Sequence, residues 1–271
     1  DDWQGLQIIN ISNVAAPVYA GACSPLSTAW GVFVSGAYAY VAGIEQTLEI
    51  INVSNVAAPS RTGAFDTTGY AYRVFVSGTY AYSTATESGL KIINISNAAL
   101  PTQVGSFDTG GYAVSIFVSG AYAYVGDGFL SLLHIINISD VAVPTLTKTF
   151  NISISSVNVS GTYAYVTGGE AGLHIIDISN LAAPTLTATF DTTDAISVAI
   201  SGAYAYVADE DSGLQIINIS NVAVPSRVGG FDTTNNAQGI VVSGAYAYVG
   251  DGWSGVQIIN ISDVTHPILA P

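Results

Sequence analysis

Positive charge is the scarcest property of this sequence. Its 271 residues include five Lys and Arg against 19 Asp and Glu, which gives a formal net charge of −14. A surface with so few cations cannot displace the counterions of a phosphate backbone, so we expect no nucleic-acid partner. Anionic membrane surfaces are disfavoured for the same reason.

Cysteines and long apolar runs are also scarce. The single Cys23 cannot form an internal disulfide, and we expect it to be a buried small hydrophobe rather than an intermolecular link. No run of about 18 apolar residues occurs, so we expect no membrane insertion. No signal peptide opens the chain, so any export signal has been removed or never existed. Abundant Ser, Thr, Asn, Ala and Tyr with little Lys favours an extracellular or cell-surface location for the mature chain.

A repeat of about 40 residues runs through the chain. Its marker is a Ser-Gly pair between two apolar segments, and the glycines follow one another at intervals of 41 or 42 residues: Gly36, Gly78, Gly120, Gly161, Gly202 and Gly244. A period of this length built from short apolar segments is typical of a propeller or a repeat array.

Each repeat contains four segments with strand character. In residues 115–150, a short apolar strand ends at the Ser-Gly turn, and an Ala/Tyr alternation follows with period 2. A strand rich in Ile comes next, and a Thr-rich alternation typical of an outer edge strand ends the repeat. No segment has the period of a helix. The pattern predicts an all-β fold, a six-bladed β-propeller of four-stranded antiparallel blades, with the paired tyrosines packing blade against blade.

Two motifs resemble the LVIVD-repeat family of β-propellers. They are Val118-Ser119-Gly120-Ala121-Tyr122-Ala123-Tyr124-Val125 and, on the third strand, Gly213-Leu214-Gln215-Ile216-Ile217-Asn218-Ile219-Ser220-Asn221. The resemblance covers nearly the whole chain, although the family's third strand usually ends in Asp and only Asp177 keeps the acid here. It implies a propeller of the kind found largely in exported and cell-surface bacterial and archaeal proteins, and no particular chemistry.

The four strands of the repeat do not occur equally often in the chain. The first and second strands occur six times, whereas the third strand occurs seven times, with Asn10, Asn52, Asn94, Asn137, Asp177, Asn218 and Asn260 at its end. We therefore expect one propeller domain over residues 1–271, in which residues 1–29 form a surplus N-terminal half-blade and residues 30–271 form six repeats.

Two interpretations of the surplus strand remain open. In the first, a monomer uses residues 16–23 as an outermost strand while residues 5–12 pack along the rim. In the second, strands pair between copies, head to tail into a fibre or reciprocally into a dimer. The candidate assembly edge comprises Leu6, Ile8, Ile9, Ile258 and Ile259.

Eight Asn-x-Ser sequons are candidates for glycosylation. Six share one repeat position, where a structural turn is the favoured interpretation: Asn10, Asn52, Asn94, Asn137, Asn218 and Asn260. Asn151 and Asn158 fall outside the repeat pattern, and Asn151 is the best single acceptor candidate.

Acidic loops are the remaining chemical feature. Asp209, Glu210 and Asp211 form the densest group and are weak candidates for Ca²⁺, because their spacing is not that of an EF-hand; a turn or a solvated loop tip is favoured. His134 and His174 share a repeat position that also accepts Lys91 and Glu49, so we expect that position to be solvated. We find no catalytic residues and no cofactor motif.

These patterns lead to a non-enzymatic extracellular structural or adhesive propeller, which assembles with further copies of itself by strand pairing. The alternative is an interaction module that binds a ligand, Ca²⁺, glycans or cell-surface proteins through its acidic loops, with Phe129 and Trp253 as exposed anchors.

Overall fold

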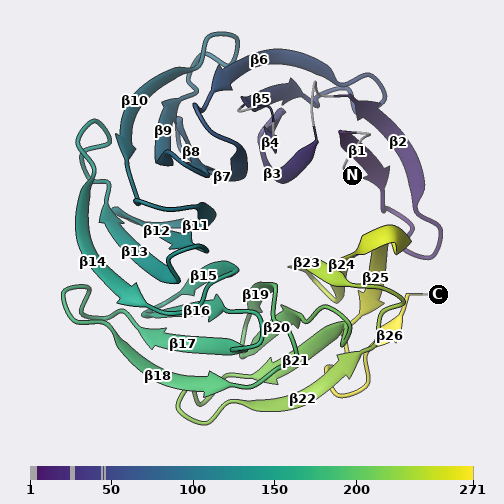
Figure 1. Cartoon of the computed structure of the whole chain (residues 1–271). Helices are drawn as coiled ribbons and strands as arrows, with labels where there is room; N and C mark the ends of the chain where they lie inside the picture. Colours follow the sequence, from purple (N-terminus) through teal and green to yellow (C-terminus); the bar gives the residue numbers. More distant parts are fainter. Residues whose placement is uncertain (1–4, 25–27, 44, 46, 271) are drawn as a thin grey trace. The chain divides into compact units, whose positions relative to one another are not determined.

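The computed structural model describes residues 5–24, 28–43, 45 and 47–270. These residues form 26 strands and one short 3₁₀ turn, η1 (Gly252–Ser254). The predicted all-β fold is confirmed: the strands make six four-stranded antiparallel blades and one additional two-stranded sheet. The fold is a six-bladed β-propeller with an N-terminal half-blade (Figure 1).

The chain divides into two compact units, residues 1–149 and 150–271, and each is described by itself below. The boundary falls inside the strand Thr145–Asn151. The one domain over residues 1–271 stays a prediction.

The first unit contains the half-blade and three blades. The half-blade consists of β1 (Leu6–Asn10) and β2 (Val18–Cys23). The first blade consists of β3 (Ala29–Ser35), β4 (Tyr38–Gly43), β5 (Thr47–Asn52) and β6 (Ser60–Asp66). The second consists of β7 (Ala71–Ser77), β8 (Tyr80–Ala85), β9 (Gly89–Asn94) and β10 (Thr102–Phe107). The third consists of β11 (Ala113–Ser119), β12 (Tyr122–Asp127), β13 (Leu132–Asn137) and β14 (Thr145–Asn151).

The second unit contains three blades. The fourth blade consists of β15 (Ser156–Ser160), β16 (Tyr163–Thr167), β17 (Leu173–Asp177) and β18 (Thr185–Phe190). The fifth consists of β19 (Ser197–Ser201), β20 (Tyr204–Ala208), β21 (Leu214–Asn218) and β22 (Ser226–Phe231). The sixth consists of β23 (Ala237–Ser243), β24 (Tyr246–Asp251), β25 (Val256–Asn260) and β26 (Ile268–Leu269).

The Ser-Gly pairs make the turns between the first and second strands, as the sequence predicts. In the third blade Ser119 pairs with Tyr122, so the turn consists of Gly120 and Ala121. The six turn glycines have φ between 56° and 59°. A positive φ at the first turn residue is the geometry of a type II′ hairpin, which glycine adopts without steric cost.

The Ala/Tyr alternation packs neighbouring blades together within each unit. Tyr82 on β8 faces the third blade, where it contacts a buried cluster that includes Ala123, Ile116 and Val118. Leu90 and Ile92 on β9 join the same cluster, whereas Ile93 turns to the first blade. The predicted role of the tyrosines is therefore confirmed, since one blade's aromatic rings lie on the small residues of the next.

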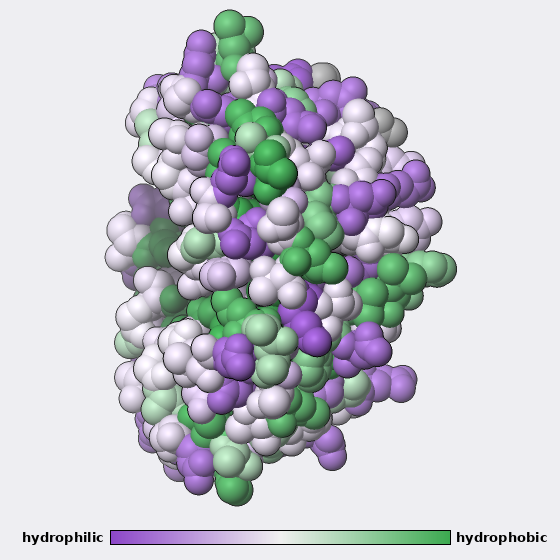
Figure 2. All heavy atoms as spheres, turned by 90° about the vertical axis from the view of Figure 1, so that its left-hand side faces the viewer, coloured by the Kyte–Doolittle hydropathy of each residue, from purple (hydrophilic) through white to green (hydrophobic). Residues whose placement is uncertain are grey.

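Polar and apolar residues are mixed on the surface. Figure 2 shows hydrophobic atoms in several separate patches, interspersed with weakly polar residues and a few hydrophilic ones. This surface agrees with the low charge content of 9%. On the face shown, no single apolar patch marks a docking surface.

Candidate functional site

The half-blade is the feature that distinguishes this chain from a plain six-fold repeat. β1 pairs antiparallel with β2 in a separate two-stranded sheet. In the sixth blade β25 pairs with β24 on one side and with β26 on the other. The predicted mismatch is confirmed, because β1 and β25 are two copies of one strand and only β25 has inner strands beside it among the described residues.

This pairing corrects the first interpretation of the surplus strand. There, residues 16–23 were expected to form an outermost strand while residues 5–12 packed along the rim. The structure instead joins β2 to β1, and β26 is the outer strand of the sixth blade. The two residues of β26 make it much shorter than the other outer strands.

The two halves of the candidate assembly edge differ in exposure. Ile258 and Ile259 on β25 are buried and lie between paired strands. Leu6 and Ile8 on β1 are half-buried, and Ile9 is exposed. Of these five residues, those on β1 are therefore more exposed than those on β25.

The half-blade covers part of the first blade. Leu6 and the half-buried Cys23 pack against Ala39, Val41 and Ile51, which are buried on β4 and β5. Burial, with a contribution from Glu49, raises the pKa of the Cys23 thiol above its ordinary value. Within the described residues, the half-blade contributes only the two strands β1 and β2 to this cover.

The uncovered part of the first blade lies on its innermost strand. Val32 and Val34 on β3 are 55% and 61% exposed, whereas the equivalent Val74 and Val76 on β7 are each 7% exposed. In the second blade these valines pack against the inner strands of the blade before it, including Tyr40 and Phe33. Among the described residues of the first unit, no strand covers Val32 and Val34, which leaves an open position over β3.

This region is also free of charge in the sequence. Residues 3–44 contain no Asp, Glu, Lys, Arg or His, although the whole chain carries −14. The charge-free stretch was readable from the sequence, but its meaning depends on the open position, which only the structure shows.

The acidic loops do not gather into a cation site. Asp209 is buried, and its two carboxylate oxygens accept the backbone N–H groups of Thr193 and Asp194. Asp211 is exposed, and Glu210 is half-buried with a φ of 32°. Burial, together with Asp194 and Asp211, raises the pKa of Glu210 above its ordinary value. Within the described residues, no three His, Cys, Asp or Glu side chains lie where they could hold a metal ion.

Asp209 has equivalents in two other blades, and all three are buried structural groups. Asp251 accepts the backbone N–H of Asn235, and Asp127 accepts that of Leu130. A buried carboxylate is stable when such donors replace its water. The loop-tip interpretation is therefore wrong for Asp209, because its carboxylate, like that of Asp251, ties the loop before an inner strand to the end of the second strand.

The histidines contradict the expectation of a solvated position. His134 and His174 are only 5% and 8% exposed. Their Nδ1 atoms lie 3.3 Å and 3.0 Å from the hydroxyls of Thr149 and Thr189, and their Nε2 atoms have no partner among the described residues. Burial lowers the pKa of both imidazoles below the ordinary 6.5, while Asp127 and Asp191 act in the opposite direction. The expectation of a solvated position was wrong because the polar residues at the equivalent positions in other blades, Glu49 and Gln215, are buried as well.

A cavity of about 230 Å³ lies in the second unit. Its walls come from the end of β18 and the following loop, from the loop after β20, and from β21 and β22. The lining residues are Phe190, Asp191, Thr192, Thr193, Asp209, Ser212, Gln215 and Arg227. Sequence reasoning identified Asp209 but not its partners, which come from segments up to about 40 residues apart.

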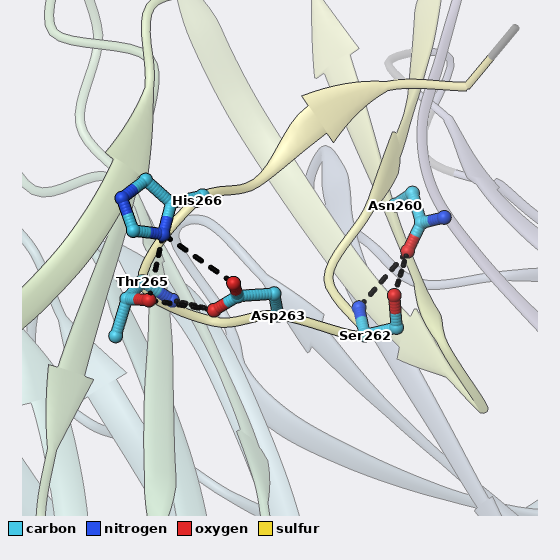
Figure 3. A network of polar contacts seen from close by, with 5 residues as sticks. All are labelled: Asn260, Ser262, Asp263, Thr265 and His266. Carbon is cyan, nitrogen blue, oxygen red and sulfur yellow. Dashed lines mark hydrogen bonds and ion pairs between the residues drawn. The ribbon is translucent and has the colours of Figure 1, made fainter.

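The repeated sequon position makes turns, as expected. In the sixth blade Asn260 Oδ1 accepts the N–H and hydroxyl of Ser262 (Figure 3). A second turn follows, in which Asp263 accepts from Thr265 and contacts His266. The Thr265 hydrogen bonds, rather than the histidine, are the main reason that the pKa of Asp263 is lowered.

The other copies of the turn behave alike. Equivalent side-chain-to-Ser contacts occur at Asn10, Asn52, Asn94, Asn137, Asp177 and Asn218. Asn151 is exposed at the end of β14, and Asn158 is half-buried within β15. Glycosylation at any of these sites stays a prediction.

Phe129 and Trp253 are both exposed, as expected of anchors. The rings of Tyr112 and Phe129 are in tilted contact, with their centroids 5.5 Å apart. No helix formed by the described residues is long and apolar enough to cross a membrane.

Comparison with known proteins supports the fold assignment. The LVIVD repeat matches seven times, at residues 1–24, 27–67, 68–109, 110–152, 153–192, 193–233 and 235–271. The first match ends soon after β2, in agreement with a half-blade. No curated protein sequence matches the chain.

Three solved structures illustrate the range of similar folds. A Lactobacillus plantarum protein is 12% identical with a TM-score of 0.86, covering 99% of this chain and 91% of its own. A candidate 6-phosphogluconolactonase from Bacteroides fragilis is 15% identical with a TM-score of 0.79, covering 94% and 85%. The Cps50 β-propeller domain of Myceliophteria thermophila is 14% identical with a TM-score of 0.70, covering 89% and 84%. Identities this low establish the fold alone.

Proposed function

Because the chain belongs to the LVIVD-repeat family of β-propellers, whose fold alone assigns no chemistry, we propose that it is a non-catalytic structural subunit that pairs with a second copy of itself through the half-blade. The observation that carries this proposal is the open position over β3, where Val32 and Val34 are exposed while their equivalents in the next blade are buried.

The number of strands favours a second copy of the chain as the partner that fills the open position. Each full blade has four antiparallel strands, and the half-blade has two. If β1 pairs antiparallel with β1 of a second copy, the sheet β2-β1-β1-β2 has the four strands of a complete blade. The added strands then lie over β3 in each copy and cover Val32 and Val34. Pairing of an accessible strand edge is a common mode of recognition, and it displaces no strand already formed.

The charge distribution also favours self-association. Two molecules of charge −14 repel each other, so a contact between copies needs a surface that adds no like charges. The strands β1, β2 and β3 carry no charged side chain and can provide such a surface. A strongly cationic partner would be attracted to the acidic loops instead.

Sedimentation velocity of the wild-type protein and of Val34→Lys tests the proposal. We expect a concentration-dependent dimer for the wild type, and an affinity at least about tenfold weaker for Val34→Lys, because a valine is lost from the contact and a charge enters it. Val143→Lys is the matched control, since Val143 is 63% exposed on the turn before β14 and makes no part of the half-blade.

The possible outcomes separate the alternatives. Reciprocal pairing closes after two copies, so a series of larger species would instead indicate the head-to-tail fibre. A wild-type protein that stays monomeric at high concentration, or equal dimerisation of Val34→Lys and wild type, would refute the pairing. Extracellular location remains a further proposal, supported by composition alone.

A further inference from the structure

The cavity in the second unit is lined by an arginine whose counterpart in the first blade has an ion-pair partner. Arg61 on β6 pairs with Ile51, and Arg227 on β22 pairs with Ile217 in the same register. In the first blade Glu49 lies 3.6 Å from the Arg61 guanidinium. In the fifth blade Gln215 occupies the position of Glu49, so the equivalent carboxylate is missing.

Arg227 is consequently available at the cavity. Its Nε donates to the carbonyl oxygen of Gly229 at 3.3 Å, and no carboxylate of the described residues forms an ion pair with it. Asp191 lines the same cavity and is exposed. A guanidinium and a carboxylate thus border one cavity without contacting each other.

The rest of the lining is mostly polar, and several of its groups are hydrogen-bonded. Gln215 is buried and donates from Nε2 to the carbonyl oxygen of Ser212 at 2.7 Å. The hydroxyls of Ser212 and Thr193 lie 2.8 Å apart, and the buried Asp209 holds the backbone of Thr193. The Thr192 hydroxyl is buried and has no hydrogen-bond partner among the described residues. Such an atom is expected to be satisfied by a water or a ligand.

We propose that this cavity binds one ring of a neutral sugar. A sugar hydroxyl both donates and accepts, so adjacent hydroxyls can donate to Asp191 and accept from Arg227. Phe190, half-buried at the edge, offers an aromatic surface for the C–H face of the ring. The volume of about 230 Å³ lies below the range of about 300–1,000 Å³ for drug-sized ligands, so it fits a single ring.

The charged groups around the cavity disfavour anionic and cationic ligands. An anionic ligand meets Asp191 and a molecule of charge −14, whereas a cation meets Arg227. A neutral polyol can form hydrogen bonds with both charged groups and is repelled by neither. The site is separate from the half-blade, because all of its lining residues lie in the second unit.

Saturation-transfer NMR with methyl glycosides of glucose, galactose and mannose tests the site, with competition titrations to measure affinity. We expect saturable binding of at least one glycoside at millimolar concentration. Arg227→Gln should weaken it about tenfold or more, because a hydrogen bond from a charged group is lost. Gln215→Glu should weaken it similarly, because it recreates the pair seen between Glu49 and Arg61.

Arg61→Gln is the matched control and should bind as the wild type does. Thermal unfolding of each variant identifies any loss of binding that comes from misfolding. An oligosaccharide ending in the preferred sugar distinguishes the two sources of the ring: tighter binding than the methyl glycoside indicates a glycan, and equal binding indicates a free or terminal sugar. Absence of saturable binding for all three glycosides, or unchanged binding in both fifth-blade variants, would overturn the proposal.

Discussion

At the residue scale, one position on the third strand shows how the repeat accommodates polar side chains in its interior. Glu49, His134, His174 and Gln215 are all buried there, in blades that are otherwise nearly identical. A polar side chain costs free energy in such a place unless it finds a partner, and the outer strand supplies one through Thr149 and Thr189. Burial removes the water that would stabilise a charged imidazolium, which is why it lowers the pKa of both histidines.

This burial makes stability depend on pH. The folded pKa of each imidazole lies below 6.5, so the unfolded chain binds more protons as the pH falls through 6.5 towards the folded value, and the folded state loses stability there. We expect the thermal unfolding midpoint to fall between pH about 7 and about 5, and His134→Gln with His174→Gln to flatten this fall. Glutamine already occupies the position as Gln215, so the change fits the repeat.

The exposed His266 provides the control for that measurement. Its side chain is 83% exposed, so His266→Gln should leave the pH dependence as it is in the wild type. If the double variant kept the full dependence, groups other than the buried imidazoles would be responsible.

At the element scale, the outer strands depend on glycine at a bulge. The register between β9 and β10 shifts between Gln103 and Gly105, and that between β21 and β22 shifts at Ile216 and Ile217, opposite Gly229. A Cβ on Gly105 would overlap the carbonyl oxygen of Val141, and one on Gly229 would overlap that of Val264. Each carbonyl belongs to the turn that follows the third strand of the next blade. The bulge therefore brings the outer strand of one blade against the turn of its neighbour.

Replacing these glycines tests that contact. Gly105→Ala and Gly229→Ala should each cost about 1–3 kcal/mol of unfolding free energy, because the methyl group forces two backbones apart. We expect the midpoint of thermal unfolding to fall by about 2–4 °C per kcal/mol. Gly239→Ala should cause no loss, since a Cβ there has open space and φ is not positive. Ala188 holds the equivalent register in the fourth blade, so a neutral result would mean that the backbone relaxes as it does there.

At the scale of the whole molecule, the sequence predicted the repeated blades correctly but not the burial of side chains that depends on neighbouring strands. The six regularly spaced glycines repeat the same pattern in every blade. The number of blades, the order of the strands and the hairpin turns were therefore predicted correctly. The partners of the buried His134 and Asp209 lie on other segments, 15 or 16 residues away along the chain. A period-2 pattern cannot report such contacts, because it records which face a side chain takes and not what covers that face. The cavity around Arg227 was missed for the same reason.

Net charge gives the whole-molecule test of self-association. Two copies of charge −14 repel over a Debye length of about 30 Å at 0.01 M salt, but of only about 3 Å at 1 M. The strands proposed to make the contact, β1, β2 and β3, carry no charged side chain, so salt has little attraction to weaken there. We expect the dimer to strengthen as salt rises, whereas an interface built on ion pairs would weaken. Sedimentation of wild type and Val34→Lys across this range measures the effect, and tighter association at low salt would show that a charged surface, and not the half-blade, joins the copies.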